Sequence, residues 1–162
     1  MKPTRTLEWN IHEVASALQV DEQSVREYFT DGRRVAFLIE RRIAREEGFK
    51  LASSEGAAFD LVDSRGANWE VRNITRRGIY FCPSYMVGSG RSFDRSGFLR
   101  KLANVQGYIV SDIESFPAVP YWILARNVVE GWWQSGHLGA GTKISRANIL
   151  ELVRMLPDVA AD

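Results

Sequence analysis

The sequence predicts an α/β domain with a mixed central sheet flanked by helices and with a small N-terminal helical segment. Apolar residues recur with helical spacing from 33 to 47, and they alternate with polar residues from 59 to 75. The length of 162 residues fits one compact domain, and five Trp and eight Phe residues are enough to anchor its core. We therefore expect a helical segment at residues 1–32 and an α/β domain at residues 33–162.

Two short helices are expected between residues 11 and 31. Their apolar stripes are Val14, Ala15 and Leu18 in the first and Val25, Tyr28 and Phe29 in the second. Asp21 suits the N-cap position of the second helix, with Ser24 three residues after it. The pair fits a helix-turn-helix that presents its second helix to a DNA groove, and it also fits a small packing hairpin, which is the commoner arrangement.

A longer helix is predicted from about Arg33 to Glu47, and Gly48 suits its C-cap. Its apolar face consists of Val35, Ala36, Phe37, Leu38, Ile39, Ile43 and Ala44. Glu40 borders this face rather than opposing it. The carboxylate of Glu40 is therefore either held by a nearby cation or directed into a site.

A β-hairpin is predicted between residues 58 and 75, after a strand at 49–54. Ser64, Arg65 and Gly66 form its loop, and Gly66 supplies the left-handed conformation that a three-residue loop needs at its last position. In this register residue 60 faces residue 70, and residue 62 faces residue 68.

The alternation of side chains puts Asp60, Glu70 and Arg72 on one face of this hairpin. The other face takes four apolar side chains, Phe59, Leu61, Trp69 and Val71. Opposed Cβ atoms in a hairpin lie about 5 Å apart, so two facing carboxylates repel each other unless a cation lies between them. Mg²⁺ typically binds one or two protein carboxylates. With Arg72 beside them, these residues are suited to metal-assisted phosphodiester hydrolysis.

The rest of the chain predicts six further elements. They are a strand with a Gly/Ser-rich loop (76–91), an amphipathic helix (92–104), two buried strands (107–113 and 119–126), a short helix (127–136) and a terminal helix (144–156). Ser145 suits the N-cap of the terminal helix. The adjacent Trp132 and Trp133 indicate a core or a dimer surface.

Residues 33 to about 126 resemble the core of the PD-(D/E)xK nuclease superfamily, best known from the type II restriction endonucleases. The shared order is a helix, a three-stranded meander, a second helix and a further strand. The resemblance matches Asp60 to the first acid, Glu70 to the second, and Glu40 to the acid often found on the first helix. Arg72 stands where the family usually has Lys, and Phe59 stands where it has Pro.

This resemblance implies a Mg²⁺-dependent, site-specific endonuclease of restriction type that cuts double-stranded DNA. Its catalytic residues would be Asp60, Glu70, Arg72 and Glu40. Asp60 and Glu70 would hold the metal, and Mn²⁺ would be able to replace Mg²⁺. A homodimer on a palindromic site would cut both strands, and the helix around Trp132 is its candidate surface.

Two other functions stay open, and the first of them depends on Arg72. Arg keeps its charge and can clamp a phosphate, but it cannot readily exchange a proton near neutral pH. One alternative is therefore a nuclease-fold DNA-binding protein with weak or no catalysis. The other is a structure-selective repair or junction nuclease on the same core.

Seven basic residues and a single acid, Asp94, lie between residues 72 and 101. Clustered Arg is typical of a phosphate-binding surface, although a solvated basic face has the same composition. The polar, Gly-rich loop in this stretch suits contacts to phosphates and base edges, or is a plain surface loop. The predicted DNA-binding residues are Arg76, Arg77, Tyr85, Ser89, Arg91, Ser92 and Arg95.

The same stretch is also similar to the GIY-YIG nucleases, through Gly78-Ile79-Tyr80 followed by Tyr85 and Gly88. Those enzymes need a longer gap between the two halves and a metal-binding Glu downstream. The predicted helix at 92–104 contains no Glu. The resemblance to the PD-(D/E)xK core therefore explains more of the sequence.

Several kinds of protein do not fit this chain. No apolar run reaches the roughly 20 residues that span a bilayer, and no apolar stretch follows the first basic residues as in a signal peptide. The single Cys82 excludes an internal disulfide and a cysteine-based zinc cluster within one chain. His12 and His137 lie in unrelated contexts. We therefore expect a cytoplasmic protein with no membrane partner.

Overall fold

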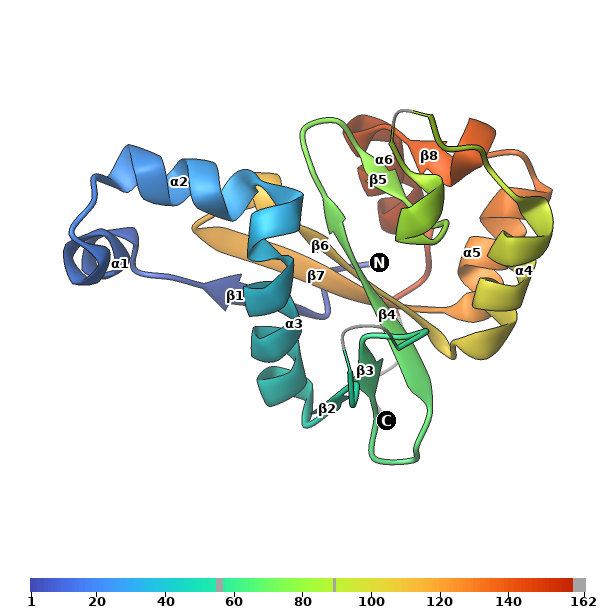
Figure 1. The fold of residues 1–162 in the computed structure, drawn as a ribbon, viewed down its shortest axis with the longest axis horizontal. Helices are drawn as coiled ribbons and strands as arrows, with labels where there is room; N and C mark the ends of the chain where they lie inside the picture. Colours follow the sequence, from blue (N-terminus) through green and yellow to red (C-terminus); the bar gives the residue numbers. More distant parts are fainter. Residues whose placement is uncertain (55–56, 89, 159–162) are drawn as a thin grey trace.

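The protein is built on a mixed six-stranded sheet, seen in a computed structural model that describes residues 1–54, 57–88 and 90–158 (Figure 1). The strand order is β1 (Arg5–Glu8), β7 (Ala118–Ala125), β6 (Gly107–Asp112), β4 (Asn68–Ile74), β3 (Leu61–Val62) and β2 (Lys50–Leu51). The β4–β6 pair is parallel and the other pairs are antiparallel. The predicted α/β class with a mixed central sheet is confirmed.

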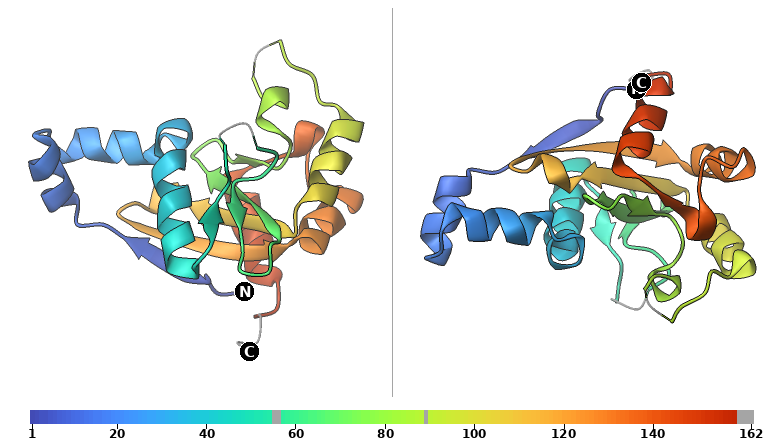
Figure 2. Two further views of the ribbon diagram at one scale, coloured as in Figure 1. Left: turned by 60° about the horizontal axis from the view of Figure 1, so that its bottom comes forward. Right: turned by 90° about the horizontal axis from the view of Figure 1, so that it is seen from above.

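Helices cover both faces of this sheet. The first face carries α3 (Gly32–Glu47), whose Val35, Ile39 and Ile43 pack with Leu61 and Val71 of the sheet. The second face carries α4 (Arg95–Asn104), α5 (Arg126–Gln134) and α6 (Arg146–Met155), which pack on the other side of β6 and β7. The view from above shows α3 and α6 on opposite sides of the sheet (Figure 2). We refer to these as the α3 face and the α4 face.

The N-terminal helices α1 (Ile11–Leu18) and α2 (Glu22–Thr30) extend from one end of the sheet (Figure 1). The predicted cap is present, because the Asp21 carboxylate accepts a 2.6 Å hydrogen bond from the backbone N–H of Ser24. Strand β1 was not predicted. Its RTLE sequence has one buried residue, Leu7, so only its pairing with β7 identifies it as a strand. The first residues of the chain thus complete the sheet of the α/β domain.

The strand predicted after the hairpin is the short β5 (Ile79–Tyr80), which leaves the main sheet and pairs with β8 (Lys143–Ile144). Gly78 allows this change of direction. Its φ is +96°, and a Cβ there would lie 2.1 Å from the Ile144 carbonyl oxygen. The terminal helix begins at Arg146 rather than 144 because Ile144 is in β8, and Ser145 caps the helix as predicted.

The short helix α5 packs into the hydrophobic core. Trp132 is only 7% exposed and packs edge-on against Phe81, and Trp133 packs against Phe98. The Trp132 side chain is thus not available as the predicted dimer surface.

No helix in the described part of the chain is both long and apolar enough to cross a membrane.

Candidate functional site

The hairpin that carries the predicted acids has the expected register. Leu61 pairs with Trp69, and Val62 pairs with Asn68. The loop closes through the Asp63 carboxylate, which accepts hydrogen bonds from the backbone N–H groups of residues 65 and 67. Gly66 has the left-handed φ of +81° that the loop length requires. The predicted pairing of the two strands is confirmed.

Asp60 lies at a bend where this pairing ends. Its backbone N–H donates to the Trp69 carbonyl at 3.0 Å, and its carboxylate accepts from the Val71 N–H at 2.8 Å. The side chain thus occupies the edge of β4 at the point where β3 departs from it. Asp60 is fixed to the strand that carries Glu70 and Arg72.

The bend corrects one part of the predicted alternation. Phe59 packs with the core on the α4 face, whereas Leu61, Trp69 and Val71 pack on the α3 face. Regular alternation would have put Phe59 with the other three. It fails because the Asp60 carboxylate, rather than a backbone carbonyl, accepts the Val71 N–H, so that the strand begins only at Leu61.

Glu70 and Arg72 share the α4 face of β4, as predicted. The Arg72 Nη2 atom lies 2.6 Å from Glu70 Oε1 and donates to the Cys82 carbonyl at 3.3 Å. The second carboxylate oxygen, Oε2, contacts the ammonium group of Lys101, which comes from α4. Glu70 is 3% exposed, so a buried carboxylate is held between two cations.

Burial raises the pKa of Glu70, while the charges of Arg72 and Lys101 act in the opposite direction. The cluster also contains buried polar atoms with no hydrogen-bond partner among the described residues, Arg72 Nε and the Tyr108 hydroxyl. Apart from the Lys101 ammonium, Glu70 Oε2 likewise has no polar partner there. Buried polar atoms without a partner are rare in native proteins, and here they gather around Glu70.

Glu40 reaches the same region from α3. It lines a cavity of about 300 Å³ together with Asp60, Phe59, Phe37 and Arg41. Burial, and then the negative charge of Asp60, raises the pKa of Glu40 to about 7. Glu70 raises the pKa further and Arg72 opposes it, so the other three predicted catalytic residues all act on the charge of Glu40.

The four predicted catalytic residues therefore meet where β3 separates from β4, but not on a single face. Glu40 approaches from the α3 face, Glu70 and Arg72 lie on the α4 face, and Asp60 lies at the edge between them. No three acidic, His or Cys side chains of the described residues are close enough to form a ready metal cluster. The arrangement offers at most two carboxylates at once to a cation.

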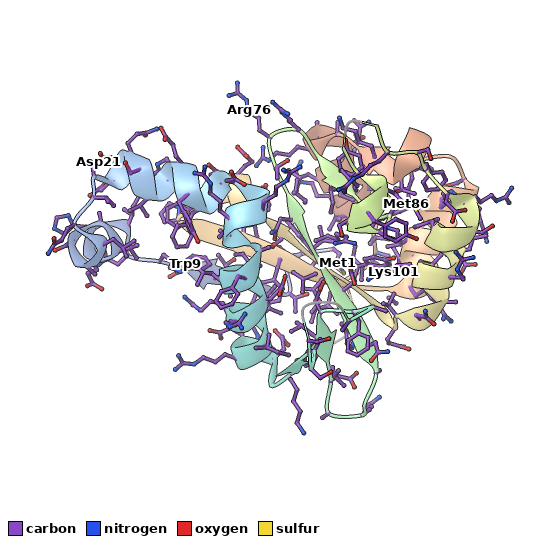
Figure 3. All side chains as sticks on the ribbon, viewed as in Figure 1. Met1, Trp9, Asp21, Arg76, Met86 and Lys101 are labelled. Atoms are coloured by element: carbon purple, nitrogen blue, oxygen red, sulfur yellow. The ribbon has the colours of Figure 1, made fainter. Side chains whose placement is uncertain are left out.

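The predicted DNA-binding residues fall into two groups. Arg76 and Arg77 are exposed in the turn after β4. Arg76 points outward there, away from Met86 and Lys101 (Figure 3). This turn is fixed by a 2.7 Å hydrogen bond from the Arg76 N–H to Glu114.

The second group lies in and after the 3₁₀ turn at Ser84–Met86. Tyr85 is 60% exposed, and Ser92 and Arg95 are also exposed. Arg91 holds the loop, because its guanidinium donates to the carbonyls of residues 84 and 87. Arg95 stacks on the ring of Trp133 at 5.1 Å. Ser89 lies outside the described residues.

The N-terminal helices do not share this basic character. Residues 11–31 contain five acids and one basic residue, Arg26, which donates to the Phe116 carbonyl at 2.8 Å. Such a surface repels DNA phosphates, so the electrostatics favour the packing-hairpin interpretation over a DNA-reading helix. The helix-turn-helix hypothesis stays a prediction.

Lys101 is the residue that sequence reasoning missed as a member of the site. A signal for it exists, since Phe98, Leu102 and Val105 form the buried stripe of α4 and Lys101 lies within that stripe at i+3 from Phe98. A Lys on the apolar face of a helix needs a buried anion. Glu70 is that anion.

No protein-family model and no curated protein matches this sequence significantly.

Proposed function

We propose that the protein is a Mg²⁺-dependent DNA endonuclease that hydrolyses phosphodiester bonds at the Asp60–Glu70 site. The observation that carries this proposal is the convergence of Glu40, Asp60, Glu70 and Arg72 where β3 leaves β4, beside a cavity. A partly buried carboxyl group such as Glu40, whose pKa is raised by burial and by neighbouring acids beside a cavity, is more typical of a functional site than of simple packing.

The residues fit a hard divalent cation. Asp60 and Glu70 offer carboxylate oxygens, and Mg²⁺ needs only one or two of these since it retains several waters. The Glu70 oxygen Oε2 would be the metal ligand, because the Lys101 ammonium is its one polar partner among the described residues. A bound Mg²⁺ would neutralise a phosphate group and activate water for attack.

The side chains of this chain would divide the remaining work. Arg72 faces the site with a permanent charge that can stabilise the phosphate. The exposed turn at Arg76 and Arg77 and the loop containing Tyr85 and Arg91 would hold the DNA backbone. One site per chain requires a homodimer for a double-strand cut, which sedimentation of the protein with and without DNA would detect.

The test is cleavage of plasmid and phage DNA, together with flap and junction substrates, with Mg²⁺, with Mn²⁺ and with EDTA. We expect metal-dependent cutting that the D60N variant abolishes without weakening DNA binding. The exposed E151Q variant on α6 is the control for an unrelated loss of charge. Discrete fragments from duplex DNA indicate a restriction-type enzyme, and cutting confined to flaps or junctions indicates a repair nuclease.

A second candidate is a DNA-binding protein without catalysis. It is favoured by one observation, the engagement of Arg72 with Glu70 and with the Cys82 carbonyl, which commits its guanidinium to structural contacts. Binding that is indifferent to Mg²⁺, with no cutting of any substrate under either metal, would replace the endonuclease proposal with this one.

A further inference from the structure

Two large apolar side chains are exposed beside the proposed site. Phe37 on α3 is 52% exposed, and Leu51 on β2 is 39% exposed. The sequence predicts Phe37 within the apolar face of its helix, yet the core on the α3 face does not include it. A single exposed apolar side chain is ordinary, whereas two that line one cavity form an apolar wall for a ligand.

Phe37 and Leu51 both line the cavity of about 300 Å³ that also contains Glu40 and Asp60. Its walls come from α3, from β2 and from the segment that leads into β3, which lie side by side in Figure 1. Pockets for small ligands measure about 300 to 1,000 Å³, so this cavity suits one small ring system. Its lining combines apolar side chains with two acids.

Arg41 forms a flat layer on the Phe37 ring. The guanidinium carbon Cζ lies 3.3 Å from the ring centroid, and Nη1 of Arg41 donates to the Phe37 carbonyl at 3.4 Å. Both side chains are exposed and line the cavity. Nucleobases stack on aromatic rings, and arginine adds cation–π attraction to such stacks. The layer therefore offers a planar surface of the kind on which an unpaired base stacks.

The acids of the cavity complement the edge of a base. Carboxylate oxygens accept hydrogen bonds from exocyclic amino groups, such as N4 of cytosine. Glu40 follows Phe37 by three positions on α3, so the two side chains lie on the same side of the helix. A base stacked at Phe37 thus has an acceptor for its amino group within the same cavity.

Asp60 belongs both to this cavity and to the proposed metal site. A base in the cavity therefore belongs to a nucleotide close to the phosphate that the metal would bind. The bases of an intact duplex are paired and stacked, so only an unpaired or extruded base can enter a pocket. We propose that the cavity binds an unpaired nucleobase of a DNA strand and that the substrate class is DNA with an unpaired nucleotide beside the cut, an assignment that rests on the proposed endonuclease function.

Three DNA duplexes of one sequence separate recognition of the base from recognition of the flexible backbone around it. The first is fully paired, the second has one additional unpaired cytidine, and the third has an abasic site in place of that cytidine. Affinities are measured in EDTA, so the result does not depend on cleavage. We expect the parent chain to bind the cytidine duplex about tenfold more tightly than the abasic duplex, because stacking of the base is lost in the latter.

Two variants of the apolar wall test whether the cavity causes this preference. F37A/L51A removes both apolar side chains, and its affinities for the cytidine and abasic duplexes should agree within about twofold. Both positions are exposed, so the fold should be retained, which the thermal midpoint checks. F37Y keeps a planar ring and should keep the preference. M155A removes a 74% exposed apolar side chain from α6 and is the control.

The outcomes separate base binding from cleavage. Equal affinity of the parent for the cytidine and abasic duplexes overturns the role of the cavity, and so does a folded F37A/L51A that keeps the preference. Displacement of the cytidine duplex by free deoxycytidine monophosphate at the same concentration overturns the assignment to a DNA strand.

The cut is then mapped on the cytidine duplex with Mg²⁺. We expect cleavage at a phosphate next to the unpaired cytidine, and cuts at other positions overturn the placement of the base beside the site. A preference for the cytidine duplex without any metal-dependent cleavage supports base binding and overturns the endonuclease function.

Discussion

The carboxylate of Asp60 accepts a hydrogen bond from the backbone N–H of Val71, so the first acid of the site is fixed to the strand residue that follows the second acid. The side chain of Val71 itself packs on the α3 face. One peptide group therefore sets the distance between Asp60 and Glu70, independently of the hairpin loop.

The D60N and D60A variants should differ in stability but not in activity. Asn keeps an oxygen that can accept the Val71 N–H, whereas Ala leaves that group unsatisfied at a cost of about 1 kcal/mol. We expect both variants to lose cleavage and D60A alone to lose stability, measured by urea unfolding. Equal stability of the two would show that this hydrogen bond is replaced by water.

Replacement of Glu40 by Gln should stabilise the protein in a pH-dependent way. The pKa of Glu40 is raised from 4.5 to about 7, so the native state holds this proton more tightly than the unfolded state. The contribution of Glu40 to the stability of the parent chain therefore falls as pH rises from about 4.5 to about 7 and is constant above that.

The gain of E40Q should consequently be near zero at pH 4 and about 1 to 2 kcal/mol at pH 8, a range that allows for solvent screening of a partly exposed group. Urea unfolding in EDTA across this pH range measures it. A gain that does not depend on pH would mean that Glu40 has an ordinary pKa.

Removal of the Glu70 charge should destabilise the fold strongly. E70Q leaves Arg72 and Lys101 as neighbouring, largely buried cations, and loss of one partner of a buried pair costs about 3 kcal/mol. The double variant E70Q/K101M should be more stable than the sum of its single variants predicts, because it removes one of the two uncompensated charges. A double-mutant cycle by urea unfolding measures the coupling, and strict additivity would contradict the contact.

The exposed turn after β4 should contribute to DNA affinity through charge alone. R76A/R77A leaves the backbone hydrogen bond to Glu114 in place and removes two charges. If both contact phosphates, the slope of log affinity against log salt should become less steep by about two. Titration of duplex DNA at several salt concentrations measures this slope. R154A, an exposed arginine on α6, is the control and should leave it unchanged.

The hairpin was predictable because local rules determine it. Gly66 at the end of a three-residue loop and the alternation of apolar side chains were sufficient for the register and for Glu70 and Arg72 on one face. The bend at Asp60 was not predictable, because it depends on a hydrogen bond to a residue eleven positions away. Asp60 consequently meets Glu70 at the strand edge rather than on a shared face.

Strand β1 and the contact of Lys101 could not be predicted, because each depends on residues that lie far apart in the sequence. Strand β1 exists only through its pairing with β7, and the contact between Lys101 and Glu70 joins a helix and a strand 31 positions apart. By charge alone, Lys101 is one of the seven basic residues that predict an exposed phosphate-binding surface. Its place in the buried stripe of α4 was the more informative property.

The geometry of the site also determines which insertions and deletions this sequence can accept during evolution. The loop at residues 64–66 is exposed and carries no part of the site, so evolution can lengthen or shorten it. A single residue inserted between Glu70 and Arg72 would instead turn Arg72 to the α3 face and separate it from Glu70. Distant homologues should therefore preserve the two-residue step along β4 and a basic residue about two turns into α4, while the length between the two acids drifts.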